Sequence, residues 1–114
     1  METEIKLSFA KLYISTRRIG EDILITIQGG ERPHIGTAVL AVPRFSLTGD
    51  ESASTTSSVM NVTGHKDDVI CRILAEKASK KYGVTVVCTG GFHMDNISSA
   101  QIEEVIAAVQ NFAF

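Results

Sequence analysis

Residues 84–98 read VTVVCTGGFHMDNIS, an apolar run followed by two glycines and then by histidine, aspartate and asparagine. The β-branched residues at the start of the run favour a strand over residues 84–89. Gly90 and Gly91 then favour a corner at which the backbone can take positive φ and a ligand can approach closely. The segment therefore predicts a strand that leads into a glycine corner, and the corner carries His93, Asp95 and Asn96.

Helical patterns flank this segment on both sides. Before it, apolar residues at 70, 73, 74, 78 and 82 follow helical spacing after His65, with aspartates in the first turn. Gly83 then has the place of a glycine that ends a helix. After it, Ser98 and Gln101 have the spacing of a capping box. We expect helices over residues 65–82 and 98–112.

Three β-rich segments precede both helices. Residues 5–15 alternate loosely, residues 22–28 place three isoleucines on one face, and residues 35–42 form an apolar run closed by Pro43. We expect an antiparallel meander of three strands, with a hairpin turn at RRIGED. The following stretch RFSLTGDESASTTSSV is polar and predicts a long loop, and residues 59–63 favour a short fourth strand.

The resulting order of elements is βββ(β)αβα, which is typical of an α+β fold. We expect a mostly antiparallel sheet covered by two helices on one face. The length of 114 residues and the absence of a linker in the sequence predict a single domain over residues 1–114.

The composition argues against several classes of function. A content of 44% hydrophobic and 21% charged residues is typical of a globular protein, and a net charge of -2 without a basic block argues against a nucleic-acid partner. Apolar runs stay below the ~18 residues of a membrane helix, and the acidic start METEIKLSFAK is unlike a signal peptide. We therefore expect a cytoplasmic protein, with Cys71 and Cys88 as buried free thiols.

Two glycine pairs suggest a wall of a ligand site. Gly29 and Gly30 end a predicted strand, as Gly90 and Gly91 do, and the helix start after the second pair favours an anion such as phosphate. The sequence contains neither GxxxxGK[ST] nor GxGxxG, which argues against the standard nucleotide loops. Lys66 in GHKDD either binds a substrate anion or is a solvated residue of the first helical turn.

Every histidine lies near a glycine: His34 in GGERPHIG, His65 in GHKDD and His93 in GGFHMDN. Histidine and aspartate are ligands of divalent transition metals, zinc above all. If the fold brings these loops together, they predict a shared metal site. Its candidate ligands are His34, His65, His93, Asp68 and Asp95. The alternative is that each histidine caps a loop or is partly buried without a ligand.

Together, GGERPHIG, GHKDDVICRILAEKASKKYG and VVCTGGFHMDNISSAQIEEV resemble the LpdD-like prenylated-flavin chaperones, which are accessory proteins of UbiD-like decarboxylases. The resemblance covers roughly residues 22–110. It implies a non-catalytic homodimer, similar in fold to proteasome-assembly chaperones, that holds prenylated FMN or FMN and assists maturation of a UbiD-like decarboxylase. The motif positions it marks are His34, His65, Asp68, His93, Asp95 and Asn96.

The types of residue at these positions suggest how such a protein would bind its flavin. Histidines would hold a divalent metal, and the metal and a helix N-terminus would bind the flavin phosphate weakly enough for release. The candidate flavin-binding residues are Gly29, Gly30, His34, Lys66, Gly90, Gly91 and Asn96.

Two other functions stay open on the sequence. A small metal-dependent hydrolase or lyase would use His93 as a base, with Asp95 orienting it. An assembly chaperone without a cofactor would use its histidines only for structure.

Overall fold

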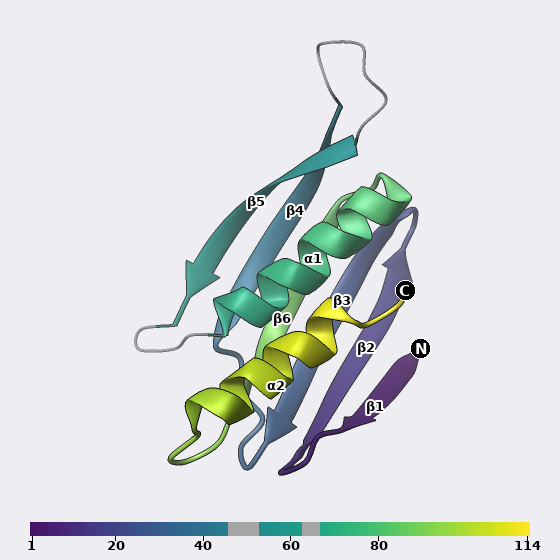
Figure 1. Ribbon diagram of the computed structural model, residues 1–114. Coiled ribbons are helices and arrows are strands. Elements are labelled where there is room, and N and C mark those ends of the chain that lie inside the picture. Colours follow the sequence, from purple (N-terminus) through teal and green to yellow (C-terminus); the bar gives the residue numbers. More distant parts are fainter. Residues whose placement is uncertain (46–52, 63–66) are drawn as a thin grey trace.

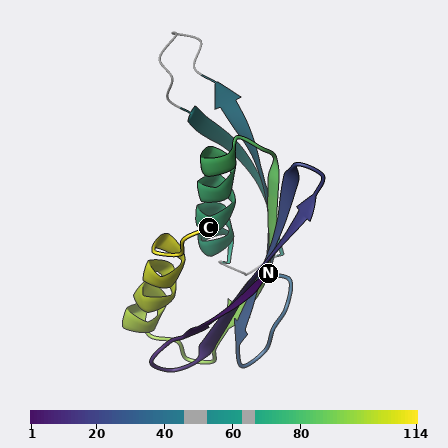
Figure 2. The same cartoon turned by 90° about the vertical axis from the view of Figure 1, so that its right-hand side faces the viewer.

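The computed structural model describes residues 1–45, 53–62 and 67–114, which form a six-stranded sheet with two helices on one face (Figures 1 and 2). Among the described residues, no helix covers the opposite face of the sheet (Figure 2). This confirms the predicted α+β class and the predicted position of both helices. The elements are β1 (Glu2–Lys6), β2 (Lys11–Ile19), β3 (Asp22–Gly30), β4 (Thr37–Phe45), β5 (Ala53–Asn61), α1 (Asp68–Tyr82), β6 (Val86–His93) and α2 (Ser99–Gln110).

The order of the strands differs from the predicted meander. The sheet runs β1-β2-β3-β6-β4-β5, so β6 lies between β3 and β4. Only β3 and β6 are parallel among these neighbours, and the sheet is mostly antiparallel as predicted. The third strand of the expected meander was therefore assigned the wrong neighbour, because β4 pairs with β5 and β6 and not with β3.

The structure has two strands, β1 and β2, where the sequence predicted one strand over residues 5–15. β1 and β2 form a hairpin, in which the backbone N–H of Leu7 donates to the carbonyl of Ala10 at 2.8 Å. The predicted turn at RRIGED is confirmed: Ile19 pairs with Asp22, and Gly20 between them has a φ of 61°. A positive φ of this size is readily adopted by glycine, which explains the residue at this turn.

β5 lies in the stretch that the sequence assigned to a long polar loop. It pairs with β4 along its whole length at the edge of the sheet, where serine and threonine side chains can face water. The loop prediction was thus wrong for residues 53–58. Of the short strand expected at 59–63, residues 59–61 form the end of β5, and residue 63 lies outside the described residues. Residues 46–52 lie outside the described residues.

Both helices have the predicted end signals. Gly83 closes α1 with a φ of 66° and donates its N–H to the Ser79 carbonyl at 2.8 Å. At the start of α2, the Ser98 hydroxyl accepts from the Gln101 N–H at 3.1 Å and the Gln101 side chain accepts from the Ser98 N–H at 2.9 Å. Within the described residues, neither helix is long and apolar enough to span a membrane.

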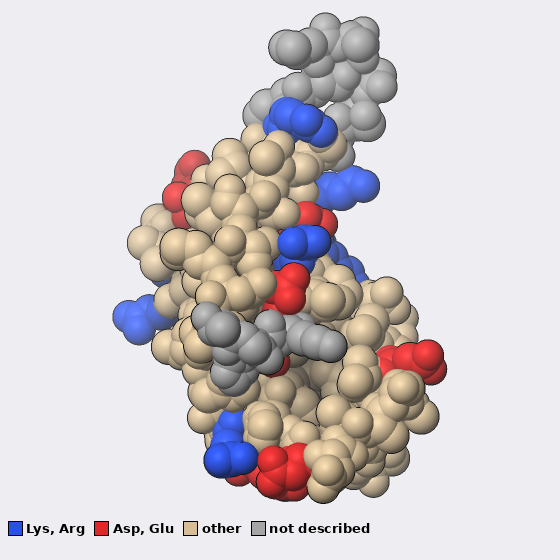
Figure 3. All heavy atoms as spheres, turned by 90° about the vertical axis from the view of Figure 1, so that its left-hand side faces the viewer, with Lys and Arg blue, Asp and Glu red and all other residues tan. Residues whose placement is uncertain are grey.

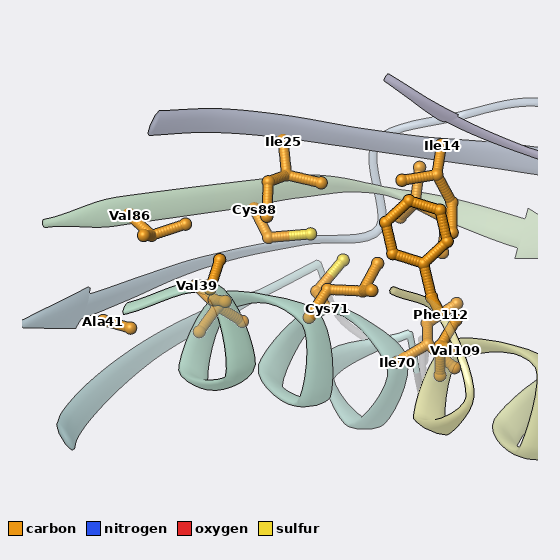
Figure 4. Close-up of a cluster of buried hydrophobic side chains, with 14 of the residues drawn as sticks. Ile14, Ile25, Val39, Ala41, Ile70, Cys71, Val86, Cys88, Val109 and Phe112 are labelled. Carbon is orange, nitrogen blue, oxygen red and sulfur yellow. The ribbon is translucent and has the colours of Figure 1, made fainter. Parts of the chain in front are cut away.

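The hydrophobic core fills the space between the sheet and the helices (Figure 4). Alternate residues of β2 and β3 point into it, which is the pattern expected of strands with one buried face. Cys71 of α1 and Cys88 of β6 are buried free thiols as predicted. A hydrogen bond with Cys71 and burial together raise the pKa of the Cys88 thiol. Other fully buried core residues are Leu12, Ile14, Ile25, Ile27, Val39, Leu74, Val86 and Val109.

Candidate functional site

The two glycine pairs lie inside neighbouring parallel strands. β3 continues to Gly30, and β6 continues through Gly90 and Gly91 to His93. A Cβ atom on Gly90 would lie 1.7 Å from the carbonyl oxygen of Ile27, so only glycine allows this approach of the strands. The predicted corner was therefore wrong, although Gly30 and Gly90 do have the expected positive φ, at 78° and 135°. The glycines extend the parallel pair, and polar side chains gather where both strands end.

His34 and Asp67 form a largely buried pair beside the end of β6. His34 Nε2 lies 3.1 Å from Asp67 Oδ2, and the two side chains are 23% and 8% exposed. The other carboxylate oxygen of Asp67 accepts the backbone N–H of Phe92 at 2.9 Å. Because Asp67 is also the N-cap residue of α1, this one side chain connects the helix start, β6 and the segment after β3.

Two glycines make room for this pair. A Cβ atom on Gly36 would lie 2.1 Å from Asp67 Oδ2. A Cβ atom on Gly91 would lie 2.8 Å from the His34 ring and 2.9 Å from Asp67 Oδ2. Since real Cβ atoms do not approach other atoms this closely, any larger residue at either position would displace the pair. Close packing around a carboxylate is thus the function of these glycines.

The hydrogen bonds of His34 define which nitrogen faces Asp67. Nδ1 lies 3.0 Å from the carbonyl oxygen of Arg32, which can only accept, so Nδ1 carries a proton. Nε2 then faces Asp67 either as a second N–H donor in a charged ring, or with its lone pair in a neutral ring, in which case a cation must lie between the two atoms. A histidine whose second nitrogen is fixed by a backbone carbonyl is the usual arrangement of a metal ligand.

The distance within the pair is also compatible with a shared cation. Two ligand atoms at ~2.1 Å from one zinc ion are separated by roughly 3.0 to 3.4 Å, for bond angles between octahedral and tetrahedral values. The separation of 3.1 Å between His34 Nε2 and Asp67 Oδ2 lies in this range. The pair can thus be an ion pair or two ligands of one metal.

His93 and Asp95 form a second, exposed pair. His93 Nε2 lies 2.9 Å from Asp95 Oδ1, and Arg32 Nη2 lies 3.2 Å from the same nitrogen and 3.3 Å from the same oxygen. The hydrogen bond with His93 and the charge of Arg32 lower the pKa of Asp95. The rings of His34 and His93 are 6.1 Å apart between centroids. The two pairs therefore form one polar cluster, defined here as Arg32, His34, Asp67, His93 and Asp95.

This polar cluster contains three of the five predicted metal ligands. Asp68 points to a different partner, Arg72, with 3.8 Å between carboxylate and guanidinium. Its neighbour Asp67 occupies the cluster, one residue from the predicted position. His65 and Lys66 lie outside the described residues. Among residues 1–45, 53–62 and 67–114, no group of three or more His, Cys, Asp or Glu side chains is placed to hold a metal ion.

Asn96 has a backbone role in the connection between β6 and α2. Its φ is 56°, in the left-handed region that asparagine tolerates better than most residues. This conformation reverses the chain between the end of β6 and the Ser98 cap. The side chains on either side of Asn96 belong to opposite environments: Asp95 to the polar cluster and Ile97 to an apolar hollow.

The apolar hollow lies between α1, α2 and the end of β6 and has a volume of about 390 Å³. Asp67 and His93 line it on the side of the polar cluster. Its apolar lining includes Ile70, Met94, Ile97, Ile102 and Ile106. The sequence does not predict this hollow, because the helical spacing of residues 102 and 106 is also that of ordinary core residues. Only Met94 and Ile97, apolar residues in a connection, gave a sequence signal.

Charge does not favour a free anion at the polar cluster. With neutral histidines, one arginine and two aspartates of the cluster sum to a net charge of -1. Figure 3 shows one face of the molecule, on which basic and acidic side chains are interspersed without a large block of one sign. Counting only the described residues, an anionic ligand therefore requires added positive charge here, from a metal ion or from protonated histidine.

Comparison with solved structures identifies the fold as that of an assembly chaperone. The chain is similar to a protein in the crystal structure of a chaperone complex for yeast 20S proteasome assembly, with a TM-score of 0.56 and 13% identity. The match covers 96% of this chain and 92% of the other. At this identity the likeness shows the fold alone.

Sequence comparison then shows the family. The model of the prenylated flavin chaperone LpdD-like domain matches residues 8–113, so the chain belongs to this family. It is also 32% identical over 89 residues to Protein LpdD of Lactiplantibacillus plantarum, which covers 74% of this chain. The matched region spans 58% of that relative's length. The family resemblance of the three sequence segments is thereby confirmed.

Proposed function

We propose that this protein is a chaperone for prenylated FMN that assists maturation of a UbiD-like decarboxylase. The observation that carries the proposal is the match to the LpdD-like family over residues 8–113. The polar cluster and the adjacent apolar hollow support it, because a flavin nucleotide has an anionic phosphate at one end and a ring system at the other. The chaperone acts by binding and releasing the cofactor, without turnover of its own.

The phosphate binds at the polar cluster with the help of a divalent metal. Of the described residues, His34 Nε2 and Asp67 Oδ2 would hold the metal, and His93 and Arg32 would face the phosphate from the exposed side of the cluster. When bound, the metal supplies the positive charge that the cluster needs to attract an anion. His65 and Asp95 stay candidate ligands from the sequence. Zinc is the first metal to test, since it prefers histidine and carboxylate.

A titration with flavins tests both parts of the proposal. Purified protein is titrated with FMN and with prenylated FMN, with and without a chelator, and binding is followed by flavin fluorescence. We expect saturable binding that the chelator weakens and that His93→Ala weakens more than Ser58→Ala, a matched change on the exposed edge strand β5. Absence of binding of either flavin to the untreated protein removes the chaperone assignment. Binding that is insensitive to chelator and to His93→Ala removes the metal and phosphate mechanism.

Binding should also depend on pH. A histidine must be neutral to coordinate a metal, so flavin affinity should fall as the pH drops below roughly 6. The same titration at pH 7.5 and pH 5.5 measures the effect, with total metal held constant. Equal affinity at the two pH values contradicts coordination by histidine.

One observation favours a second candidate function. His93 and Asp95 are 2.9 Å apart, which is the geometry of a base and the carboxylate that orients it. A metal-dependent hydrolase or lyase would therefore turn over a substrate without a partner enzyme. Metal-dependent turnover by the protein alone, lost in Asp95→Asn, would favour this function over that of a chaperone.

We further propose that the protein is a homodimer that associates through the open face of its sheet. Leu40 and Val42 are 41% and 42% exposed, and both alternate along β4 with residues of the helix-covered face. A second copy would cover these side chains, and closed two-fold dimers are the most frequent assembly. Light scattering should give about 25 kDa, twice the 12.3 kDa of one chain, and Leu40→Lys should lower it toward the monomer mass. A monomer mass for the unmodified protein contradicts this proposal.

A further inference from the structure

The apolar hollow next to the polar cluster has the properties of a ligand site. Its volume of about 390 Å³ lies within the ~300 to 1,000 Å³ of pockets for small molecules. Eight of the ten residues that line it are apolar, and the remaining two, Asp67 and His93, belong to the polar cluster. A molecule seated here would thus have apolar surroundings and one polar end.

The rim of the hollow exposes apolar side chains that a ligand would cover. Val69 on α1 is 43% exposed and Ile102 on α2 is 42% exposed, although both are residues that normally prefer the interior. They lie on different helices on the two sides of the same hollow. Covering both would remove apolar surface from water, which favours binding of an apolar group.

The floor of the hollow is held by aromatic packing. Phe92 lines it and packs edge-on against Phe9 with 5.9 Å between ring centroids. The backbone N–H of Phe92 is fixed by Asp67 at 2.9 Å. The same carboxylate therefore connects the floor of the hollow to the polar cluster, so the two parts of the site have a defined relative position.

We propose that the hollow binds the ring end of the flavin, with its added isoprenoid unit, while the polar cluster holds the phosphate end. This inference rests on the proposed function and adds a basis for specificity. The prenylated cofactor is larger and more apolar than plain FMN, so contacts with both helices favour it. The isoprenoid unit is the chemical group that the hollow selects.

A matched pair of variants tests the inference. Ile102→Ser removes apolar contact at the rim, and Ile19→Ser makes the same change at an exposed isoleucine at the far end of β2, outside the hollow. We expect Ile102→Ser to lower the affinity for prenylated FMN about tenfold, which is the loss expected from one to two buried methylene groups. The affinity for plain FMN should fall less. Ile19→Ser should leave both affinities unchanged. Thermal unfolding of both variants checks that each is folded.

The outcomes separate this inference from the proposed function. If the unmodified protein binds flavin and Ile102→Ser binds both flavins equally well, the hollow is not the ring site, while the chaperone function stands. If neither flavin binds, the chaperone function fails, and anilinonaphthalene sulfonate, an aromatic anion, becomes the probe. A fluorescence increase of this dye that Ile102→Ser reduces and Ile19→Ser does not would support the hollow as a site for apolar anions. Equal increases in all three proteins would overturn it.

Discussion

Two histidine and aspartate pairs lie side by side in this protein and differ mainly in their exposure to water. In the first, His34 and Asp67 come from distant parts of the chain and are 23% and 8% exposed. In the second, His93 and Asp95 are two residues apart and are 36% and 58% exposed. The distances between nitrogen and oxygen, 3.1 and 2.9 Å, are nearly equal.

The difference in exposure shows that two pairs with equal distances can contribute unequally to the stability of the fold. A buried carboxylate must be fully satisfied, since an unpaired partner left behind in the interior is costly. An exposed pair exchanges its partners with water at little cost. The buried pair therefore fixes the structure of the polar cluster, and the exposed pair can change partners more easily.

The largest expected effect separates the two aspartates. Asp67→Ala should lower the free energy of unfolding by about 3 kcal/mol, because it leaves half-buried His34 and the Phe92 N–H without this buried acceptor. Asp95→Ala, the matched change in the exposed pair, should lie within the error of the measurement. Urea unfolding followed by circular dichroism gives both values. Similar losses in the two variants would contradict the distinction between the pairs.

A smaller loss of stability is expected from a substitution that places an extra atom against the His34 and Asp67 pair. Gly36→Ala should cost about 2 kcal/mol, because its Cβ atom would lie 2.1 Å from Asp67 Oδ2 and the pair would have to move. If that contact is the cause, the same change should cost much less in the Asp67→Ala background. Urea unfolding of the single and double variants measures the coupling. An undiminished cost in the double variant would assign the effect to the backbone instead.

The smallest effect concerns the exposed pair and pH. The pKa of Asp95 is lowered, first by the hydrogen bond with His93, so the folded state favours the charged carboxylate. Any stability from this pair is present above the ordinary carboxyl pKa of ~3.9 and is lost as the pH falls through the lower folded value. Asp95 therefore adds no pH dependence between pH 5 and 8. Carboxyl NMR titration should show the Asp95 pKa rising in His93→Ala, and an unchanged pKa would exclude His93 as the cause.

The sequence predicts where helices and strands begin and end better than it predicts which strands pair in the sheet. The capping box at Ser98 and the glycine at 83 are read correctly because their hydrogen bonds join residues close in the chain. The insertion of β6 between β3 and β4 depends on pairing over long distances, for which periodicity carries no signal. Residues 53–58 of β5 were missed for another reason: an edge strand can be polar, so its composition resembles that of a loop.

The candidate site was predicted in its residue types and missed in its geometry. Histidines 34 and 93 do lie close together, but the glycines beside them serve close packing and not a corner. Asp67 and Asp68 cannot be distinguished by composition, and the start of α1 decides which one faces β6. The hollow depends on two helices and a connection, which no single pattern contains.

The central position of β6 has a consequence for the order of folding during synthesis. The chain makes β1 to β3 and then β4 and β5, yet these two groups share no edge until the strand at residues 86–93 has left the ribosome. Until then, the inner edges of β3 and β4 have unpaired backbone groups, which is a risk for association with other nascent chains. The last strand to be made thus completes the sheet, and α2, which follows it in the chain, then completes the hollow.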